Sequence, residues 1–227
     1  MPTLAVTGAS GKTGWRVVAE ALNRGWQVRA IVRPGSQIPE GLAQAVAAGA
    51  SLHRLELTNT EALLAGLQGC DALVIATGAR PSVDLLGPMK VDALAIRDQI
   101  AACKSLGLKR VVLVSSLCAG RWAHPLNLFG LILVWKRLGE RWLEQSGLDV
   151  TVVRPGGLSE DDSRSDREGV VFSGADQQES NSIPRRLVAQ VCLDAVATPE
   201  SIGRIVEITS NPAEPQRSLG DWLTAAG

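Results

Sequence analysis

The sequence of 227 residues contains no tyrosine, and it has only two histidines, two phenylalanines and two methionines. A mechanism that takes a proton from a tyrosine phenol is therefore excluded, and histidine is available as a general acid or base at only two positions. Excess positive charge is also missing, because 23 lysines and arginines are balanced by 23 aspartates and glutamates. General nucleic-acid binding, which depends on a basic excess or a basic patch, is not expected.

Long apolar runs and clustered cysteines are absent as well. No apolar run approaches the roughly 20 residues that a membrane-spanning helix needs. Cys70, Cys103, Cys118 and Cys192 are far apart and form no CxxC pair, so we expect reduced thiols and no metal site. The chain begins almost directly on an apolar run, MPTLAV, from which we expect no signal or transit peptide. These features predict a cytoplasmic protein, and the length favours one domain.

Short apolar runs rich in β-branched residues alternate with helix-like stretches along the chain. Near-continuous apolar strands are typical of a parallel sheet that is covered on both faces. The alternation predicts the α/β class: a Rossmann-type doubly wound parallel sheet in a single domain over residues 1–227, with a small C-terminal substrate-side region from about 155 to 227. Strands are expected at 3–7, 27–32, 51–57, 71–77, 110–116, 149–154 and 204–209. Helices are expected at 12–23, 59–67, 91–106, 134–146 and 184–197, and the charged segment 159–169 is expected to be a mobile loop.

The stretch TGASGKTG, residues 7–14, combines features of two phosphate-binding loops. A P-loop needs a glycine five residues before its Gly-Lys pair, and Val6 stands there, so ATP binding is not expected. A dinucleotide-binding turn fits instead. Its first glycine permits the sharp turn, its second lets the backbone approach a pyrophosphate, and its third lets the next helix pack closely. The residues expected to bind the cofactor here are Gly8, Ser10, Gly11, Lys12, Thr13 and Gly14.

The residue at the end of the second expected strand indicates which dinucleotide is bound. NAD-dependent enzymes usually carry a carboxylate there, which accepts hydrogen bonds from the adenosine ribose. Arg33 follows this strand in AIVRP, and a guanidinium can bind a 2′-phosphate with two hydrogen bonds. The alternative is a solvated surface arginine. Arg33 favours NADP(H) as the cofactor, with Lys12 as a second positive charge.

The order of several motifs supports this interpretation. TGASGKTG is followed by IVR, VIATGA, VLVSS, LVWKRLGERWLEQSGLDVTVVRPGGL and IPRRLVAQVCLDA. Over nearly its whole length the chain resembles the atypical short-chain dehydrogenase/reductases. The resemblance is to their NAD(P)-binding, NmrA-like branch, which includes plant and cyanobacterial proteins and the biliverdin-IXβ reductase/flavin reductases. The resemblance implies that Thr77 and Gly78 lie beside the cofactor, that Pro155 and Gly156 line the nicotinamide, and that Ser115 and Ser116 face it.

One departure from the wider family concerns catalysis. Typical short-chain dehydrogenases use a Tyr-x-x-x-Lys pair, in which the lysine lowers the tyrosine pKa. The residue four positions before Lys136 is Ile132, so this mechanism is not available. The resemblance implies that Lys136 binds the cofactor ribose, and the alternative is an exposed helix lysine. Ser115, Ser116 and Lys136 are the candidate catalytic residues.

The first function hypothesis is an NADPH-dependent reductase of a conjugated, planar substrate, such as a flavin or a linear tetrapyrrole like biliverdin. Hydride transfer to a delocalised acceptor needs little acid catalysis, so the protein mainly has to position it. Residues 115–130, SSLCAGRWAHPLNLFG, offer suitable groups, each of which also has a structural alternative as a strand end, core residue or solvated loop residue. The candidates are Ser116 as a proton relay, Arg121 for a propionate or phosphate, Trp122 as an aromatic wall and His124 as a proton donor.

The second hypothesis is a non-catalytic NADP(H)-binding sensor or assembly protein, which the missing tyrosine also suits. The run 126–135, LNLFGLILVW, is apolar almost throughout and too short to span a bilayer. It is interpreted as a buried helix start, a substrate wall, or a docking surface for a partner protein or a membrane.

Val6 in place of a P-loop glycine generates the first testable prediction. Titration calorimetry should show binding of NADP(H) and no magnesium-dependent binding of ATP, because the first phosphate-cradling glycine is missing. Tight Mg-ATP binding that Lys12→Ala abolishes would contradict this interpretation of residues 7–14.

Overall fold

The centre of the molecule is a twisted sheet that is parallel except at one edge. The computed structural model describes residues 1–78, 89–119, 125–128, 131–178 and 180–226. Over these residues the main sheet has eight strands in the order β3-β2-β1-β4-β5-β6-β10-β8, and only the edge strand β8 runs antiparallel. Its strands are β1 (Thr3–Thr7), β2 (Gln27–Val32), β3 (Ser51–Arg54), β4 (Ala72–Ile75), β5 (Arg110–Val114), β6 (Asp149–Pro155), β8 (Gly169–Ser173) and β10 (Ile205–Asn211). This order confirms the predicted doubly wound α/β fold.

Every expected strand is present: β1 and β2 have the expected bounds, β3, β4 and β5 are two or three residues shorter, and β6 and β10 are one residue longer. Sequence reasoning missed the edge strand β8 and a separate two-stranded sheet formed by β7 (Gly157–Ser159) and β9 (Ser182–Pro184). These strands have three to five residues and form by pairing with strands far along the chain, so local periodicity does not predict them.

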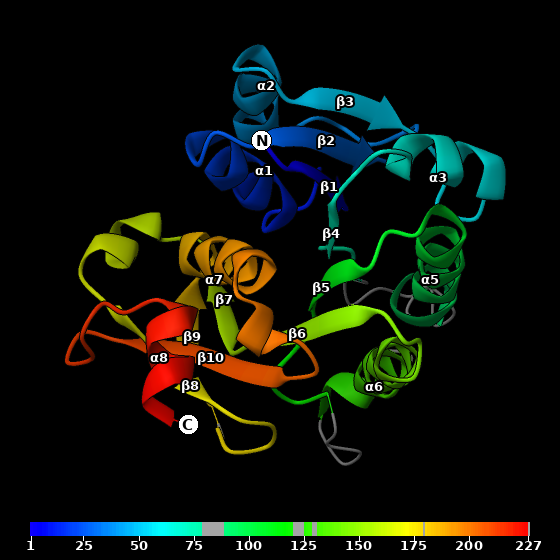
Figure 1. Cartoon of the computed structure of the whole chain (residues 1–227). Coiled ribbons are helices and arrows are strands. Elements are labelled where there is room, and N and C mark those ends of the chain that lie inside the picture. The colour runs from blue at the N-terminus through cyan, green and yellow to red at the C-terminus, as the bar shows by residue number, and fades with distance from the viewer. Residues whose placement is uncertain (79–88, 120–124, 129–130, 179, 227) are drawn as a thin grey trace.

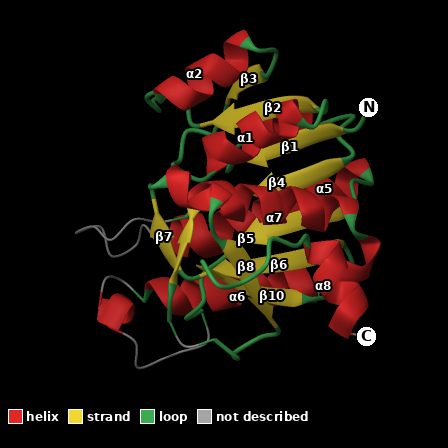
Figure 2. Cartoon of the chain, turned by 90° about the vertical axis from the view of Figure 1, so that its left-hand side faces the viewer, coloured by secondary structure: helices red, strands yellow, loops and turns green. Residues whose placement is uncertain are grey.

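Helices cover both faces of the sheet, as Figures 1 and 2 show. Helices α1 (Gly14–Asn23), α2 (Glu40–Ala47), α7 (Arg185–Ala197) and α8 (Leu219–Ala226) pack on one face. Helices α3 (Thr60–Leu67), α5 (Ala95–Leu106) and α6 (Ile132–Glu144) pack on the other face. Short 3-10 helices lie at η2 (Pro125–Leu128), η3 (Asp162–Asp166) and η4 (Pro199–Ser201). Helices α2 and α8 were not expected from the sequence. Residues 91–106 were expected to form one regular helix, but a π-helical turn, η1 (Lys90–Leu94), precedes α5.

The two cores follow from strand periodicity. Along β5, Val112 and Val114 face the core under α1 and α7, whereas Val111 and Leu113 face the core under α5. Successive strand residues point to opposite faces, so a continuously apolar strand supplies both layers at once. Because the strands are parallel, their carboxyl ends lie at the same edge of the sheet, and the loops that follow them share that edge.

The charged segment 159–169 differs from the expected mobile loop. It contains η3, where the Asp161 side chain accepts from the backbone N–H of Ser163 at 3.1 Å. Arg164 Nε donates to Glu168 Oε1 at 2.7 Å, and Ser210 Oγ donates to Glu168 Oε2 at 2.5 Å. These side-chain bonds give a polar sequence a defined conformation that hydropathy alone does not reveal.

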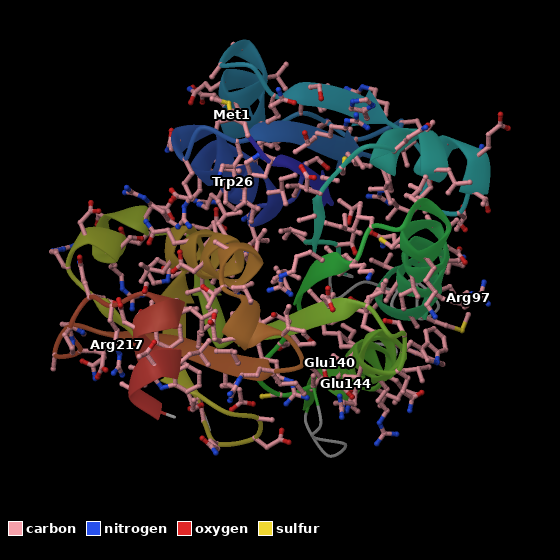
Figure 3. The ribbon with its side chains drawn as sticks, in the orientation of Figure 1. Met1, Trp26, Arg97, Glu140, Glu144 and Arg217 are labelled. Carbon is pink, nitrogen blue, oxygen red and sulfur yellow. The ribbon has the colours of Figure 1, made fainter. Side chains whose placement is uncertain are left out.

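A buried charge network ties α6 to the sheet. Arg154 of β6 is 1% exposed, and its Nε and Nη2 donate to the two carboxylate oxygens of Glu140 on α6 at 3.0 and 2.8 Å. Its Nη1 lies 2.9 Å from Asp176 Oδ1 and 3.4 Å from Glu207 Oε1. Glu140 and its neighbour Glu144 are labelled on α6 in Figure 3. Burial would lower the pKa of Arg154, but the hydrogen bonds and charge of Glu140, with the charges of Asp176 and Glu207, raise it.

The four cysteines are free thiols, and none of the described helices is long and apolar enough to cross a membrane. Burial raises the pKa of both Cys103 and Cys192 to about 12, which keeps these two core thiols protonated.

The Arg154 network predicts a large stability effect. Arg154→Met should lower the free energy of unfolding by about 3–5 kcal/mol, because it leaves Glu207 buried without its cation and removes the two hydrogen bonds from Arg154 to Glu140, which keeps only Arg137 at 3.0 Å. Arg97→Met is a matched control, since Arg97 is 61% exposed and, within the described residues, forms an ion pair only with the neighbouring Asp98. It should change stability by less than about 0.5 kcal/mol. Equal urea midpoints for the two variants would contradict the role assigned to Arg154.

Candidate functional site

A cleft of about 330 Å³ opens at the edge where β1, β4, β5 and β6 end. The strand order reverses between β1 and β4: strands β2 and β3 are added on one side of β1, and β4, β5 and β6 follow on the other side. Open α/β sheets bind ligands at such switch points. Most residues predicted from the sequence are brought together here. Those that line the cleft are Gly11, Lys12, Thr13, Thr77, Gly78, Ser115, Ser116, Lys136, Pro155 and Gly156.

The glycine turn forms the cleft wall below α1. Gly8 has a left-handed φ of +74°, and the N–H of Gly11 donates to the Gly8 carbonyl at 2.8 Å, which closes the turn. A Cβ at Gly14 would lie 2.2 Å from the same carbonyl oxygen, so only glycine permits this approach of α1. Helix α1 begins at Gly14 rather than at the expected Lys12, directly after this turn.

The opposite wall is set by hydrogen bonds between the ends of β5 and β6. The N–H of Ser115 donates to the Val153 carbonyl at 2.8 Å, and the N–H of Leu117 donates to the Pro155 carbonyl at 2.9 Å. This pairing holds the residue between them, Ser116, beside Pro155. A Cβ at Gly156 would lie 2.2 Å from the Asn181 carbonyl oxygen, so glycine allows the loop before β9 to close this wall.

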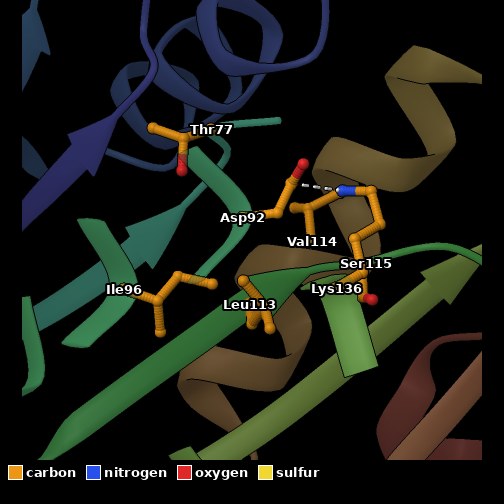
Figure 4. Close-up of a pocket in the computed structure, with 7 residues that line it drawn as sticks. All are labelled: Thr77, Asp92, Ile96, Leu113, Val114, Ser115 and Lys136. Carbon is orange, nitrogen blue, oxygen red and sulfur yellow. Dashed lines mark hydrogen bonds and ion pairs between the residues drawn. The ribbon is translucent and has the colours of Figure 1, made fainter. Parts of the chain in front are cut away.

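Buried polar groups lie at the floor of the cleft. Lys136 Nζ of α6 is 2.9 Å from Asp92 Oδ1 of η1, and Figure 4 shows this ion pair beside Thr77 and Ser115. The Thr77 and Ser115 hydroxyls are buried and have no hydrogen-bond partner among the described residues. A buried hydroxyl without a partner costs about 1–3 kcal/mol, so a polar ligand that bonds to them would gain affinity.

Basic side chains surround the mouth of the cleft, and several meet carboxylates of the segment 159–169. Lys12 Nζ contacts Glu160, and Arg16 Nε donates to Asp162 Oδ2 at 2.7 Å. The hydrogen bond from Lys12 lowers the pKa of the Glu160 carboxyl. Arg185, the first residue of α7, donates through Nη1 to Thr13 Oγ1 at 2.9 Å. Lys12 and Arg185, which line the cleft, thus bring positive charge to the N-terminus of α1, where an anion is stabilised, and Glu160 offsets part of that charge.

Arg33 lies outside the cleft, exposed just after β2. Its carbonyl accepts from the N–H of Ser36 at 3.0 Å, which makes a tight turn. Arg54 of β3 braces this turn from the next strand, because its Nη1 donates to the carbonyls of Pro34 at 2.8 Å and Ser36 at 3.0 Å. The turn that carries Arg33 at the end of β2 is thus hydrogen-bonded to the neighbouring strand β3.

Some predicted residues are not placed in the cleft. Gly8, Ser10 and Gly14 shape the turn without lining it, and Arg121, Trp122 and His124 lie outside the described residues. The run 126–135 is described only in part. Within it Ile132 and Leu133 are buried, as a helix start should be, whereas Leu128 and Leu131 are 82% and 49% exposed.

Several residues that line the cleft or its floor were not predicted from the sequence, among them Leu158, Arg185, Asp92 and the apolar Ala76 and Val114. Arg185 stands in the motif IPRRLVAQVCLDA, which was a usable signal. Asp92 falls within a stretch expected to be regular helix, and nothing in the local sequence marks it.

The residues present fit a nicotinamide dinucleotide. The turn before α1 leaves no room for a side chain at Gly14, and the N-terminus of α1 can hold a pyrophosphate. The buried hydroxyls of Thr77 and Ser115 are available to polar groups of the ligand. No group of three or more potential metal ligands is placed to hold a metal ion in the part of the chain that the structure describes.

Comparison with known sequences gives a consistent result. Residues 8–199 match the model of a protein family described as NAD(P)H-binding. An uncharacterized chloroplastic protein of Arabidopsis thaliana is 36% identical over 97% of this chain and 81% of its own length. Sanguinarine reductase of Eschscholzia californica is 28% identical over 92% of this chain and 89% of its length. Protein TIC 62 of Pisum sativum, also chloroplastic, is 29% identical, but the match spans only 45% of it. The location of this chain stays a prediction.

Solved structures share the fold. A protein of Bacillus halodurans described as an NAD-dependent epimerase/dehydratase superposes with a TM-score of 0.83 and 27% identity, over 99% of this chain and 100% of that one. ChuY of Escherichia coli, described as an anaerobilin reductase, gives a TM-score of 0.72 and 22% identity over 95% of this chain and 100% of its own.

The exposed guanidinium of Arg33 predicts a cofactor preference. Arg33→Ala should weaken NADPH binding by roughly 10- to 150-fold, because a hydrogen bond to a charged group contributes about 1.5–3 kcal/mol, and it should leave NADH binding nearly unchanged. Calorimetric titration of both cofactors measures this, and Arg97→Ala, which removes an equally charged exposed side chain from α5, is the control. Equal losses for NADPH and NADH would contradict the assignment.

Proposed function

This chain belongs to the NAD(P)H-binding family, and we propose that it is an NADPH-dependent reductase of a conjugated, planar acceptor such as a flavin or a linear tetrapyrrole. The observation that carries the proposal is the cleft itself. It combines a dinucleotide turn with a lysine and two serines, but the chain has no tyrosine with which to protonate a simple carbonyl.

The cofactor would be held by three groups of residues. Gly11 lets the backbone approach the pyrophosphate, Lys12 and Thr13 offer N–H groups to it, and Lys12 adds positive charge. Arg33, on its supported turn, suits the 2′-phosphate that distinguishes NADPH. Lys136 and the Thr77 hydroxyl are available to the ribose and nicotinamide at the floor. When bound, the cofactor supplies a hydride.

The protein groups near the acceptor favour a substrate that stabilises its own charge. The position four residues before Lys136 is Ile132, which is 4% exposed and belongs to the core. A developing alkoxide from a simple ketone needs a strong, positioned donor, and none of the described cleft residues is a phenol or an imidazole. Ser115 and Ser116 can donate weak hydrogen bonds, which suffice for a delocalised acceptor.

The names of two similar proteins support a reductase function for this chain. One is sanguinarine reductase, and the other is an anaerobilin reductase, which acts on a tetrapyrrole. The half-exposed Leu158 adds an apolar contact at the cleft mouth. Trp122, as the predicted aromatic wall, would add stacking worth about 0.5–1.5 kcal/mol beyond its buried area.

The decisive assay follows loss of NADPH absorbance with two sets of acceptors. Turnover is expected with FMN, riboflavin or biliverdin and should be negligible with small aldehydes and ketones. Ser116→Ala should slow turnover by less than the roughly 100-fold that a positioned general acid contributes, because water can supply the proton. Robust reduction of a simple ketone would contradict the proposal. NADPH binding without oxidation by any conjugated acceptor would instead favour the non-catalytic sensor.

A further inference from the structure

We infer that Asp92 is the positioning residue for Lys136: its carboxylate holds the lysine ammonium at the floor of the cleft, where the proposed cofactor ribose lies. The inference rests on the proposed function for what Lys136 binds. No motif in the sequence indicates this role for Asp92. Lys136 also has no partner tyrosine, because the chain contains none.

The first observation is the ion pair. Asp92 Oδ1 lies 2.9 Å from Lys136 Nζ, and the two side chains are only 3% and 14% exposed. A flexible lysine side chain loses considerable rotamer freedom when it is fixed, and a buried ammonium needs a compensating charge. Asp92 supplies that charge from a different element, so the position of Lys136 depends on how η1 and α6 pack.

The second observation is the way that the backbone brings the pair together. A Cβ at Gly139, one turn after Lys136 on α6, would lie 2.4 Å from the Asp92 carbonyl oxygen and 2.7 Å from Ile96 Cδ1. Only glycine lets η1 approach α6 this closely. The approach occurs at a π-helical turn, an uncommon conformation that is frequent at functional sites.

The third observation is that the pair faces the cleft rather than the protein core. A Cβ at Gly78, three residues after the end of β4, would lie 3.5 Å from Lys136 Nζ and 3.9 Å from Asp92 Oδ1. Thr77 and Ser115, whose buried hydroxyls have no partner in the described parts of the chain, line the same space (Figure 4). An ammonium donates three hydrogen bonds, so Lys136 can bond to Asp92 and still donate to a ligand.

A double-mutant cycle on cofactor affinity separates positioning from a merely structural contact. Lys136→Met should weaken NADPH binding by at least about tenfold, because a hydrogen bond from a charged group is lost. Asp92→Asn, which keeps the side-chain shape, should weaken binding by about tenfold when Lys136 is present. In the Lys136→Met background the same change should cause no further loss beyond about twofold, since there is no ammonium to position. Asp92→Ser is the second neutral variant if Asp92→Asn folds poorly.

A readout without cofactor makes the test independent of the proposed function. Limited acetylation of the free protein, followed by peptide mass spectrometry, compares the Lys136 amine with that of Lys104, an exposed lysine on α5. Asp92→Asn should raise the reactivity of Lys136 relative to Lys104.

An equal loss of NADPH affinity in both backgrounds, or unchanged affinity and reactivity in Asp92→Asn, would overturn the inference. A wild-type protein that binds no NADPH, but whose Lys136 becomes reactive in Asp92→Asn, would overturn the proposed function and leave the positioning role standing.

Discussion

A side chain at Gly14 would place its Cβ 2.2 Å from the carbonyl oxygen of Gly8, so the close packing of α1 against the end of β1 depends on the absence of that side chain. This approach aims the N-terminus of α1 across the edge where the parallel strands end. The loops after β4, β5 and β6 reach the same edge, and hydrogen bonds between neighbouring strand ends fix their spacing. The cleft therefore depends on strand direction and on close glycine contacts, at Gly14 on one wall and at Gly156 on the other, and the chemistry comes from the side chains placed around it.

The other side of the cleft is held by charge. Lys136 and Glu140 lie one turn apart on α6, and each has an ionic partner on a different element: Asp92 on η1 and Arg154 on β6. The Arg154 network also includes Glu207, whose carboxylate accepts the N–H groups of residues 176–178 at 2.8–3.0 Å. Such buried pairs add little net stability over apolar packing, but removing one partner is costly. We infer that they fix the position of α6, and with it Lys136, rather than stabilise the fold as a whole.

Features that depend on short, periodic segments of the sequence, such as the parallel strands and the glycine turn, could be predicted. Continuous apolar strands such as β5, and the spacing of Gly8, Gly11 and Gly14, indicated the sheet and the cofactor turn, because period and backbone freedom are properties of short segments. The strands β7, β8 and β9 and the pairing of Asp92 with Lys136 escaped prediction, because each depends on a partner far along the chain. The ordered segment 159–169 escaped for the same reason, since its carboxylates meet Lys12 and Arg16 only in the folded protein.

The central claim is that this cleft is an NADP(H) site built without a tyrosine. Its most direct test is a crystal structure of the protein grown with saturating NADP⁺. The account predicts the pyrophosphate at the N–H groups of Lys12 and Thr13, the 2′-phosphate beside Arg33, and a ribose hydroxyl within hydrogen-bonding distance of Lys136 Nζ. An ordered protein with no cofactor in the cleft, or with NADP⁺ bound elsewhere, would contradict it.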